Sequence, residues 1–300
     1  MAYADEIRSA LRTGWHRPAL ELTPLAPRVG ERAWRVETDR CRCVAVLVPA
    51  AGRSRFEAGL AAIEHLRLRG LAVAAPVRCA DGALTLGVGD GVLAVLAEVP
   101  GRALVAADPL DQQWWGDLLG TVHRELTAFN HPGLMRWHWV RPDAAHLDLE
   151  PWLRPAVAEA VAALAKLAIT DQLTYGVLHG DPVAGVFRID VTTGRTGLTG
   201  WGPAATGPLV YDVAAAVIDA GGPGAATELL DGYLAAGPVT REELEAALPV
   251  LLRFRWAEEA DRCARELAVR MRDAGAGAEP DELAAERELL GAARDALTAR

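Results

Sequence analysis

The chain has 300 residues, of which 51% are hydrophobic, so it can form one large domain or two lobes with a substantial buried core. Its formal net charge is −9 and it has no concentrated basic patch, which argues against nucleic acid as a partner. It contains no run of eighteen apolar residues, no basic-apolar leader and no zinc-type cysteine spacing, so we expect a reduced, cytoplasmic protein without a membrane partner.

The first hundred residues predict an antiparallel sheet with one inserted helix. Two turns support this, because Gly30 separates the first two strand-like runs and Asp81-Gly82 is a hairpin signal between later ones. The predicted elements, in chain order, are a helix at 4–13, strands within 20–48, a helix at 55–69 and strands at 71–77, 83–88 and 92–98.

The pattern changes at Pro100-Gly101 and is mainly helical beyond it. We therefore expect an N-terminal lobe at residues 1–99 and a C-terminal lobe at residues 100–300. The predicted helices are one around 115–126, one or two at 150–170 with an interruption near Pro155, one from a capping box at 240–243 to about 272 with a break at Pro249, and one from Pro280 to about 299.

One β-like segment, residues 176–201, interrupts the helical half. Two strand-like runs flank Thr192-Thr193-Gly194, which predicts a hairpin. Positions 186 and 200 are equidistant from Thr193. We therefore expect Val186 and Gly200 to face each other at the open end of the hairpin, just after the loop His179-Gly180-Asp181.

Several short motifs of this half occur together in one known family. They are His179-Gly180-Asp181, Gly200-Trp201 at the far side of the hairpin, Gly207-Pro208 followed by Tyr211-Asp212, and Leu118-Leu119-Gly120-Thr121-Val122-His123 upstream. Over roughly residues 20–270 the chain resembles the aminoglycoside phosphotransferase and choline/homoserine kinase-like superfamily. This resemblance implies an α+β, two-lobed, protein-kinase-like fold.

The resemblance also implies roles for site residues, and the chain departs from several of them. In such enzymes an Asp in the position of Asp181 takes the proton from the substrate hydroxyl or orients that hydroxyl. We expect His179 to anchor its loop instead of carrying a proton. The family's Asn and Asp ligands to magnesium correspond to Val186 and Gly200, which have no ligand atom. The strand that should carry a phosphate-binding lysine has none, because the one lysine of the chain is Lys166 in the helical lobe.

Two candidates remain for the nucleotide side, and each has a second interpretation. Glu57 is the candidate for the helix glutamate that pairs with the lysine, but a surface role is equally open. The turn at Gly30 is either a thin phosphate loop or an ordinary hairpin turn. Asp190 is the nearest substitute metal ligand, but it lies about 13 Å beyond Val186 along the strand, too far for magnesium with ligands at about 2 Å.

Other residues have roles that the resemblance or their position suggests. We expect Asp212 to anchor the catalytic loop or a helix start, and Trp201 to pack under the hairpin. Trp137, Trp139 and Trp152 either line a substrate cleft or belong to the core.

Three functional hypotheses follow. The first is a pseudokinase that acts by binding a small molecule or a protein partner and needs no cofactor. The second is an active ATP- and magnesium-dependent phosphotransferase of small hydroxyl compounds with relocated ligands. The third is a different chemistry on the same scaffold, with Asp181 as a base and no nucleotide.

Overall fold

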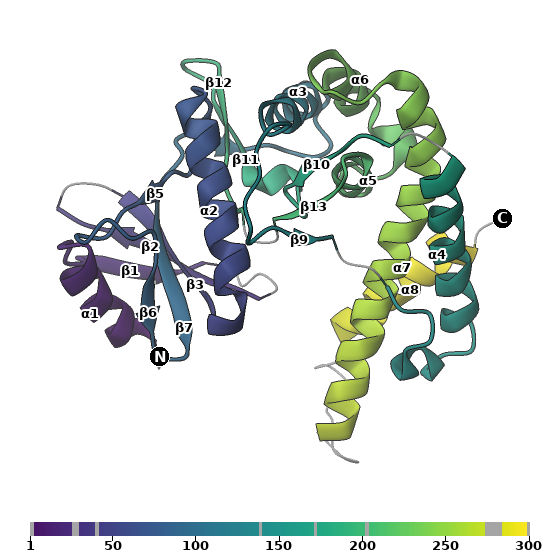
Figure 1. Ribbon diagram of the computed structural model, residues 1–300, viewed down its shortest axis with the longest axis horizontal. Coiled ribbons are helices and arrows are strands. Elements are labelled where there is room, and N and C mark those ends of the chain that lie inside the picture. The colour runs from purple at the N-terminus through teal and green to yellow at the C-terminus, as the bar shows by residue number, and fades with distance from the viewer. Residues whose placement is uncertain are drawn as a thin grey trace.

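The computed structural model describes residues 3–25, 30–39, 42–137, 140–170, 173–201, 204–273 and 284–298. Figure 1 shows an antiparallel sheet at the N-terminal end, a mainly helical C-terminal part, and helix α2 (Arg53–Leu68) between them. The predicted α+β, two-lobed fold is confirmed. Within the described residues, no helix is both long and apolar enough to cross a membrane.

The N-terminal sheet has six strands, all paired antiparallel. Their order is β1-β2-β3-β7-β5, with β6 also paired to β7. The strands are β1 (Glu21–Pro24), β2 (Arg32–Glu37), β3 (Arg42–Pro49), β5 (Pro76–Val77), β6 (Leu86–Val88) and β7 (Gly91–Ala97).

Both faces of this sheet are covered, which explains the nearly continuous apolar sequence of β3. Cys43, Ala45 and Leu47 belong to a core that also contains apolar residues of α1 (Ala4–Gly14). Val46 and Val48 lie in the main core, with the apolar face of α2. Alternate side chains of a strand point to opposite faces, so β3 connects two separate cores.

A second, four-stranded sheet joins the two halves of the chain. Its order is β4-β12-β11-β8, and it is built on the predicted hairpin. Its strands are β4 (Ala72–Val73), β8 (Arg102–Ala103), β11 (Phe187–Asp190) and β12 (Arg195–Leu198).

The prediction of a single strand at 71–77 is therefore wrong. β4 pairs in parallel with β12, whereas β5 pairs with β7 of the N-terminal sheet. A tight turn separates them, because the Ala75 N–H donates to the Val73 carbonyl at 2.7 Å. Pro76 follows this turn and has no N–H with which to continue the first pairing.

The C-terminal part consists of helices around a short sheet of β10, β13 and β9. In Figure 1 the long helix α7 runs beside α4 and α8. The helices are α3 (Pro109–Glu125), α4 (Leu153–Thr170), α5 (Val210–Asp219), α6 (Thr227–Ala236), α7 (Arg241–Asp273) and α8 (Ala284–Thr298). The strands are β9 (Met135–Arg136), β10 (Tyr175–Leu178) and β13 (Ala205–Pro208).

The two expected helix breaks do not occur. Pro155 lies in the first turn of α4, where a missing N–H costs nothing. Pro249 lies inside α7, which continues past it. The buried neighbours Leu248 and Leu251 hold this part of the helix in the core, and tertiary packing outweighs the lost hydrogen bond. The expected helix start at Pro280 lies outside the described residues, and α8 is described from Ala284.

Candidate functional site

The loop after β10 contains His179, Gly180 and Asp181, and a buried carboxylate holds it. Asp212, at the start of α5, accepts hydrogen bonds from the backbone N–H groups of His179 at 2.6 Å and Gly180 at 3.0 Å. Gly180 has a φ of +89°, a conformation that favours glycine. The predicted anchoring role of Asp212 is thus what the structure shows.

Two further side chains complete the support of Asp212. His123 Nε2 donates to the Asp212 carboxylate at 3.1 Å, and its Nδ1 is 2.9 Å from the Tyr233 hydroxyl. All three side chains are buried. Burial alone would raise the pKa of Asp212, but the hydrogen bond and charge of His123 hold this pKa below its usual value. The carboxylate therefore remains an acceptor for the loop.

The later part of the loop has its own anchors. The Trp115 indole donates to the Pro182 carbonyl at 3.0 Å, and Asp219 accepts from the Ala184 N–H at 2.8 Å. Burial, together with the charge of Asp181, raises the pKa of Asp219. Asp181 is half-buried, and its N–H donates to His179 Nδ1 at 3.3 Å. The loop thus holds Asp181 from both sides.

The hairpin after this loop differs from its expected register by one residue. Phe187 pairs with Leu198, and the next contact outward joins Val186 to Thr199 instead of Gly200. The turn has four residues between β11 and β12, which places its centre between Thr192 and Thr193.

Asp190 shapes this turn through its side chain. Its carboxylate accepts from the Thr192 N–H at 3.0 Å and the Thr193 hydroxyl at 2.7 Å. The Thr193 hydroxyl bond is the main reason why the pKa of Asp190 is lowered. The carboxylate stabilises the four-residue turn.

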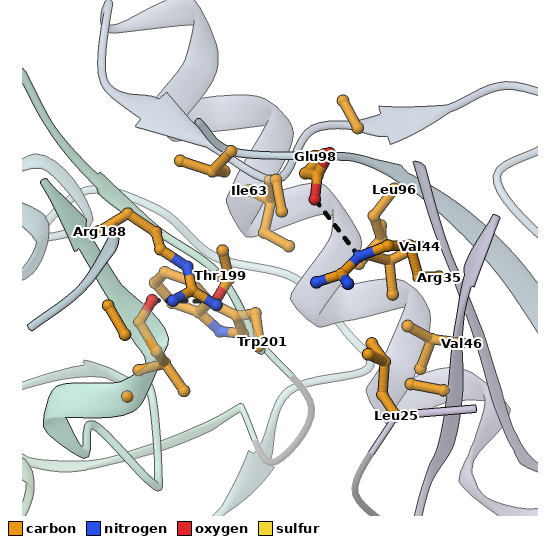
Figure 2. A pocket seen from close by; sticks show the side chains of 18 of the residues that line it. Leu25, Arg35, Val44, Val46, Ile63, Leu96, Glu98, Arg188, Thr199 and Trp201 are labelled. Atoms are coloured by element: carbon orange, nitrogen blue, oxygen red, sulfur yellow. Dashed lines mark hydrogen bonds and ion pairs between the residues drawn. The ribbon is translucent and has the colours of Figure 1, made fainter. Parts of the chain in front are cut away.

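A cleft of about 480 Å³ lies between the sheet, α2 and the hairpin. Figure 2 shows Arg188, Thr199 and Trp201 on one side of it and Arg35, Val44 and Val46 on the other. Val186 and Gly200 both line the cleft, so the two metal-ligand positions do lie together, although they do not pair across the hairpin. The other apolar lining residues include Leu25, Phe56, Leu60, Ile63, Leu96 and Val99.

The wall formed by β3 carries no charge. Its two residues that line the cleft are Val44 and Val46, on the face where a phosphate-binding lysine would have to lie. Two arginines that line the cleft form ion pairs. Arg35 Nε is 3.6 Å from Glu98, and Arg102 forms two hydrogen bonds with the buried Asp111, at 2.5 and 2.7 Å.

The two weaker sequence candidates lie outside this cleft. Glu57 accepts from Arg53 Nε at 2.9 Å and the Thr85 hydroxyl at 2.7 Å, and it is not among the cleft-lining residues described. Burial opposes ionisation of Glu57, but these hydrogen bonds give it a lowered pKa. Gly30, with a φ of +75°, lines a different hollow with Tyr3 and Asp90.

Two cleft residues were missed as functional candidates. Arg188 was not singled out, although alternation along β11 could have found it, because Phe187 and Ile189 are buried and position 188 must face the other way. Trp201 does pack beside His179, with ring centroids 5.2 Å apart, but its indole Nε1 is buried and has no hydrogen-bond partner in the described part of the chain. No sequence signal marks that atom.

A second pocket of about 300 Å³ adjoins the loop of His179, Gly180 and Asp181 at Gly180. Trp137 lines it and packs edge-on against Tyr211, with centroids 5.1 Å apart. Trp152 instead lines a surface hollow with Leu149 and Leu267, so these two tryptophans do not share a cleft. Trp139 lies outside the described residues.

The sequence profile of the phosphotransferase enzyme family matches residues 21–247. The chain belongs to this family. A protein of Deinococcus radiodurans described as uncharacterized is 29% identical over 243 residues, which is 72% of this chain and 69% of that protein.

Solved structures of two kinases share the fold of this chain. Amicoumacin kinase hAmiN, in complex with AMP-PNP and Ca²⁺, has a TM-score of 0.76 and 16% identity over 97% of this chain and 93% of that chain. A microcompartment-associated aminopropanol kinase has a TM-score of 0.77 and 15% identity over 96% and 94%. At these identities the likeness shows the fold alone, whereas the family profile over residues 21–247 confirms the predicted superfamily.

The phosphotransferase family implies a nucleotide and magnesium, and the residues at the metal positions do not fit the metal. Magnesium requires oxygen ligands in near-octahedral geometry. The side chain of Val186 is a hydrocarbon, and Gly200 has none. Elsewhere in the described ranges, no three His, Cys, Asp or Glu side chains are grouped as a metal site.

Proposed function

We propose that this phosphotransferase-family chain is a pseudokinase, which binds a small molecule or a protein partner and does not transfer phosphate efficiently. The observation that carries the proposal is the position of Val186 and Gly200 together on the cleft wall. Neither side chain can supply an oxygen to magnesium.

The opposite wall supports the same conclusion. Phosphoryl transfer depends almost entirely on positioning and on stabilising charge. Loss of one such electrostatic group costs about a hundred- to a thousandfold in rate. In this cleft Val44 and Val46 face the space where a lysine would act, so charge stabilisation is lost on both walls. Because the missing groups would act as one catalytic unit, their separate effects on the rate are not multiplied.

A turnover assay tests the proposal. The purified chain is incubated with labelled ATP, magnesium or manganese, and amino alcohol and aminoglycoside acceptors, beside an Asp181→Asn variant. We expect no transfer above the background of that variant. Robust turnover that Asp181→Asn abolishes would refute the proposal.

Restoring the ligands gives a sharper test. The double variant Val186→Asn/Gly200→Asp replaces both metal-ligand positions, and Gly200 has a φ of +69°, which Asp tolerates better than most residues. We expect magnesium-dependent stabilisation by AMP-PNP in this variant and none in the wild type. The matched control is Val191→Asn/Gly194→Asp at the tip of the hairpin, where Val191 is exposed and Gly194 also has a φ of +69°.

An active phosphotransferase with relocated ligands is the second candidate. It is supported by Asp181, which is held in its loop beside the second pocket at Gly180. This candidate predicts a rise in Tm of several degrees with millimolar ATP and magnesium in the wild-type chain. Absence of any shift would count against it and leave the pseudokinase proposal standing.

A further inference from the structure

Arg188 is a charged cleft residue for which the described part of the chain supplies no partner. Its strand neighbours Phe187 and Ile189 are buried in the core, so its side chain lies on the cleft side of β11. Figure 2 shows it reaching towards the cleft beside Thr199 and Trp201. Among the residues that the structure describes, no side-chain hydrogen bond or ion pair engages its guanidinium, which is only partly exposed. Partial burial of an unpaired charge is unfavourable, so this position favours an anionic ligand.

Trp201 lies beside Arg188, and its own donor is buried behind the cleft wall. The residue is 3% exposed, and its indole N–H has no acceptor in the described part of the chain. Buried polar groups in folded proteins are nearly always hydrogen-bonded. Because this N–H has no accessible surface, it does not face the cleft, and Arg188 is the charged donor that this wall presents to a ligand.

The other residues of the cleft limit how much negative charge the ligand can carry. The other arginines that line it, Arg35 and Arg102, are ion-paired with Glu98 and Asp111. The wall opposite Arg188 is hydrocarbon, including Val44 and Val46. Among the described lining residues one guanidinium is available, and it matches one negative charge, while the carboxylate of Glu31 on the same lining disfavours a more highly charged anion. A nucleoside triphosphate carries several, and the metal positions offer no ligand to compensate them.

We propose that the cleft binds a molecule with an apolar body and a single anionic head, a carboxylate or a sulfonate, with the head on Arg188. This proposal rests on the proposed function, because it names the ligand class of a pseudokinase cleft. A guanidinium binds a carboxylate through two parallel hydrogen bonds. The apolar body then covers the valine wall of the cleft.

Fluorescence titration with 8-anilinonaphthalene-1-sulfonate tests this ligand class, because the probe has an apolar body and one sulfonate. We expect saturable binding at one site, and displacement by 2-naphthoate at least tenfold more effective than by the neutral 2-naphthamide. Equal displacement by the two compounds would overturn the proposal, and this comparison needs no variant.

Variants of the chain then test whether the anionic head of the ligand binds at Arg188. Loss of a charge-assisted hydrogen bond corresponds to about a ten- to hundredfold loss of affinity. Arg188→Met is expected to weaken naphthoate binding by this factor and to leave naphthamide binding unchanged. The matched control is Arg195→Met, on the exposed part of the same hairpin, with affinity within about twofold of wild type. Thermal unfolding of each variant confirms that it is folded.

The two proposals fail separately. Unchanged naphthoate affinity in folded Arg188→Met would overturn the ligand class, whatever the turnover assay shows. Turnover of ATP by the wild-type chain would overturn the pseudokinase, whatever the probe shows.

Discussion

Thr199 donates two hydrogen bonds to the carbonyl oxygen of Val186, one from its backbone N–H at 2.8 Å and one from its hydroxyl at 2.9 Å. Val186 thus has a fixed position on the cleft wall. The same threonine accepts from His179 Nε2 through its own carbonyl, at 3.3 Å. The base of the hairpin and the catalytic loop are therefore one connected unit.

Replacement of Thr199 by Val should destabilise the chain by about 1 kcal/mol, because it removes the hydroxyl hydrogen bond and keeps the backbone bond. Urea unfolding measures the free energy of unfolding. The control is Thr196→Val on the same strand, whose hydroxyl makes no hydrogen bond within the described residues, and whose unfolding free energy should change by less than about 0.5 kcal/mol. Equal effects of the two changes would contradict the role of the hydroxyl.

Asp212→Ala should be strongly destabilising. The change leaves the N–H groups of His179 and Gly180 buried without their acceptor, and each such group costs about 1–3 kcal/mol. We expect a loss of at least about 3 kcal/mol in urea unfolding. Asp231→Ala removes an exposed carboxylate 3.7 Å from Arg241 and should cost less than about 1 kcal/mol. A mild effect at Asp212 would show that the loop has another support.

Stability should depend on pH through Asp111. The hydrogen bond from Arg102 holds the pKa of Asp111 below its usual value. Its contribution is therefore present above the unfolded-state pKa of about 3.9 and is lost as pH falls below that value towards the folded-state pKa. Asp111→Asn should reduce stability at pH 6 and have a smaller effect near pH 3.

Urea unfolding at several pH values measures this dependence. The control is Asp117→Asn, an exposed carboxylate on the same helix, which should leave the profile nearly unchanged. A constant difference between wild type and Asp111→Asn across the range would argue against the linkage.

Gly59→Ala and Gly291→Ala should have opposite effects. A Cβ at Gly59 would lie 2.9 Å from the Trp201 carbonyl oxygen and 3.2 Å from its Cδ1, so α2 or the strand end must move. Overpacking of this kind costs about 1–3 kcal/mol, and the helix propensity of Ala returns at most about 1 kcal/mol. At Gly291, in the interior of α8, nothing lies within 4 Å of the added carbon. Thermal unfolding should show a lower Tm for the first variant and an equal or higher Tm for the second.

The sequence predicted the hairpin but not its register. Local turn residues and alternation identify two strands, and these are short-range properties. The register depends on how many residues the turn contains, which Asp190 decides through its bonds to Thr192 and Thr193. The expected register places Thr193 at the centre of the turn. The turn has four residues, so the pairing of the two strands shifts by one residue.

Long-range contacts account for the other differences. The partition of residues 71–77 between two sheets depends on β12, more than a hundred residues later in the chain. Pro249 reads locally as a helix break, but buried neighbours hold α7 together. The loss of metal-ligand side chains, in contrast, follows from residue identity alone, so the sequence is sufficient to identify Val186 and Gly200 at these positions.

The sheet β4-β12-β11-β8 restricts how the cleft can change its width. Strands from before and after the Pro100-Gly101 link both pair with the hairpin, and a Cβ at Gly101 would lie 2.5 Å from the Ile189 carbonyl oxygen. The link therefore packs directly against the hairpin and does not act as a free hinge. Any rotation of the N-terminal sheet must either carry Val186 and Arg188 with it or break the β4 pairing. The two walls of the cleft are therefore mechanically coupled.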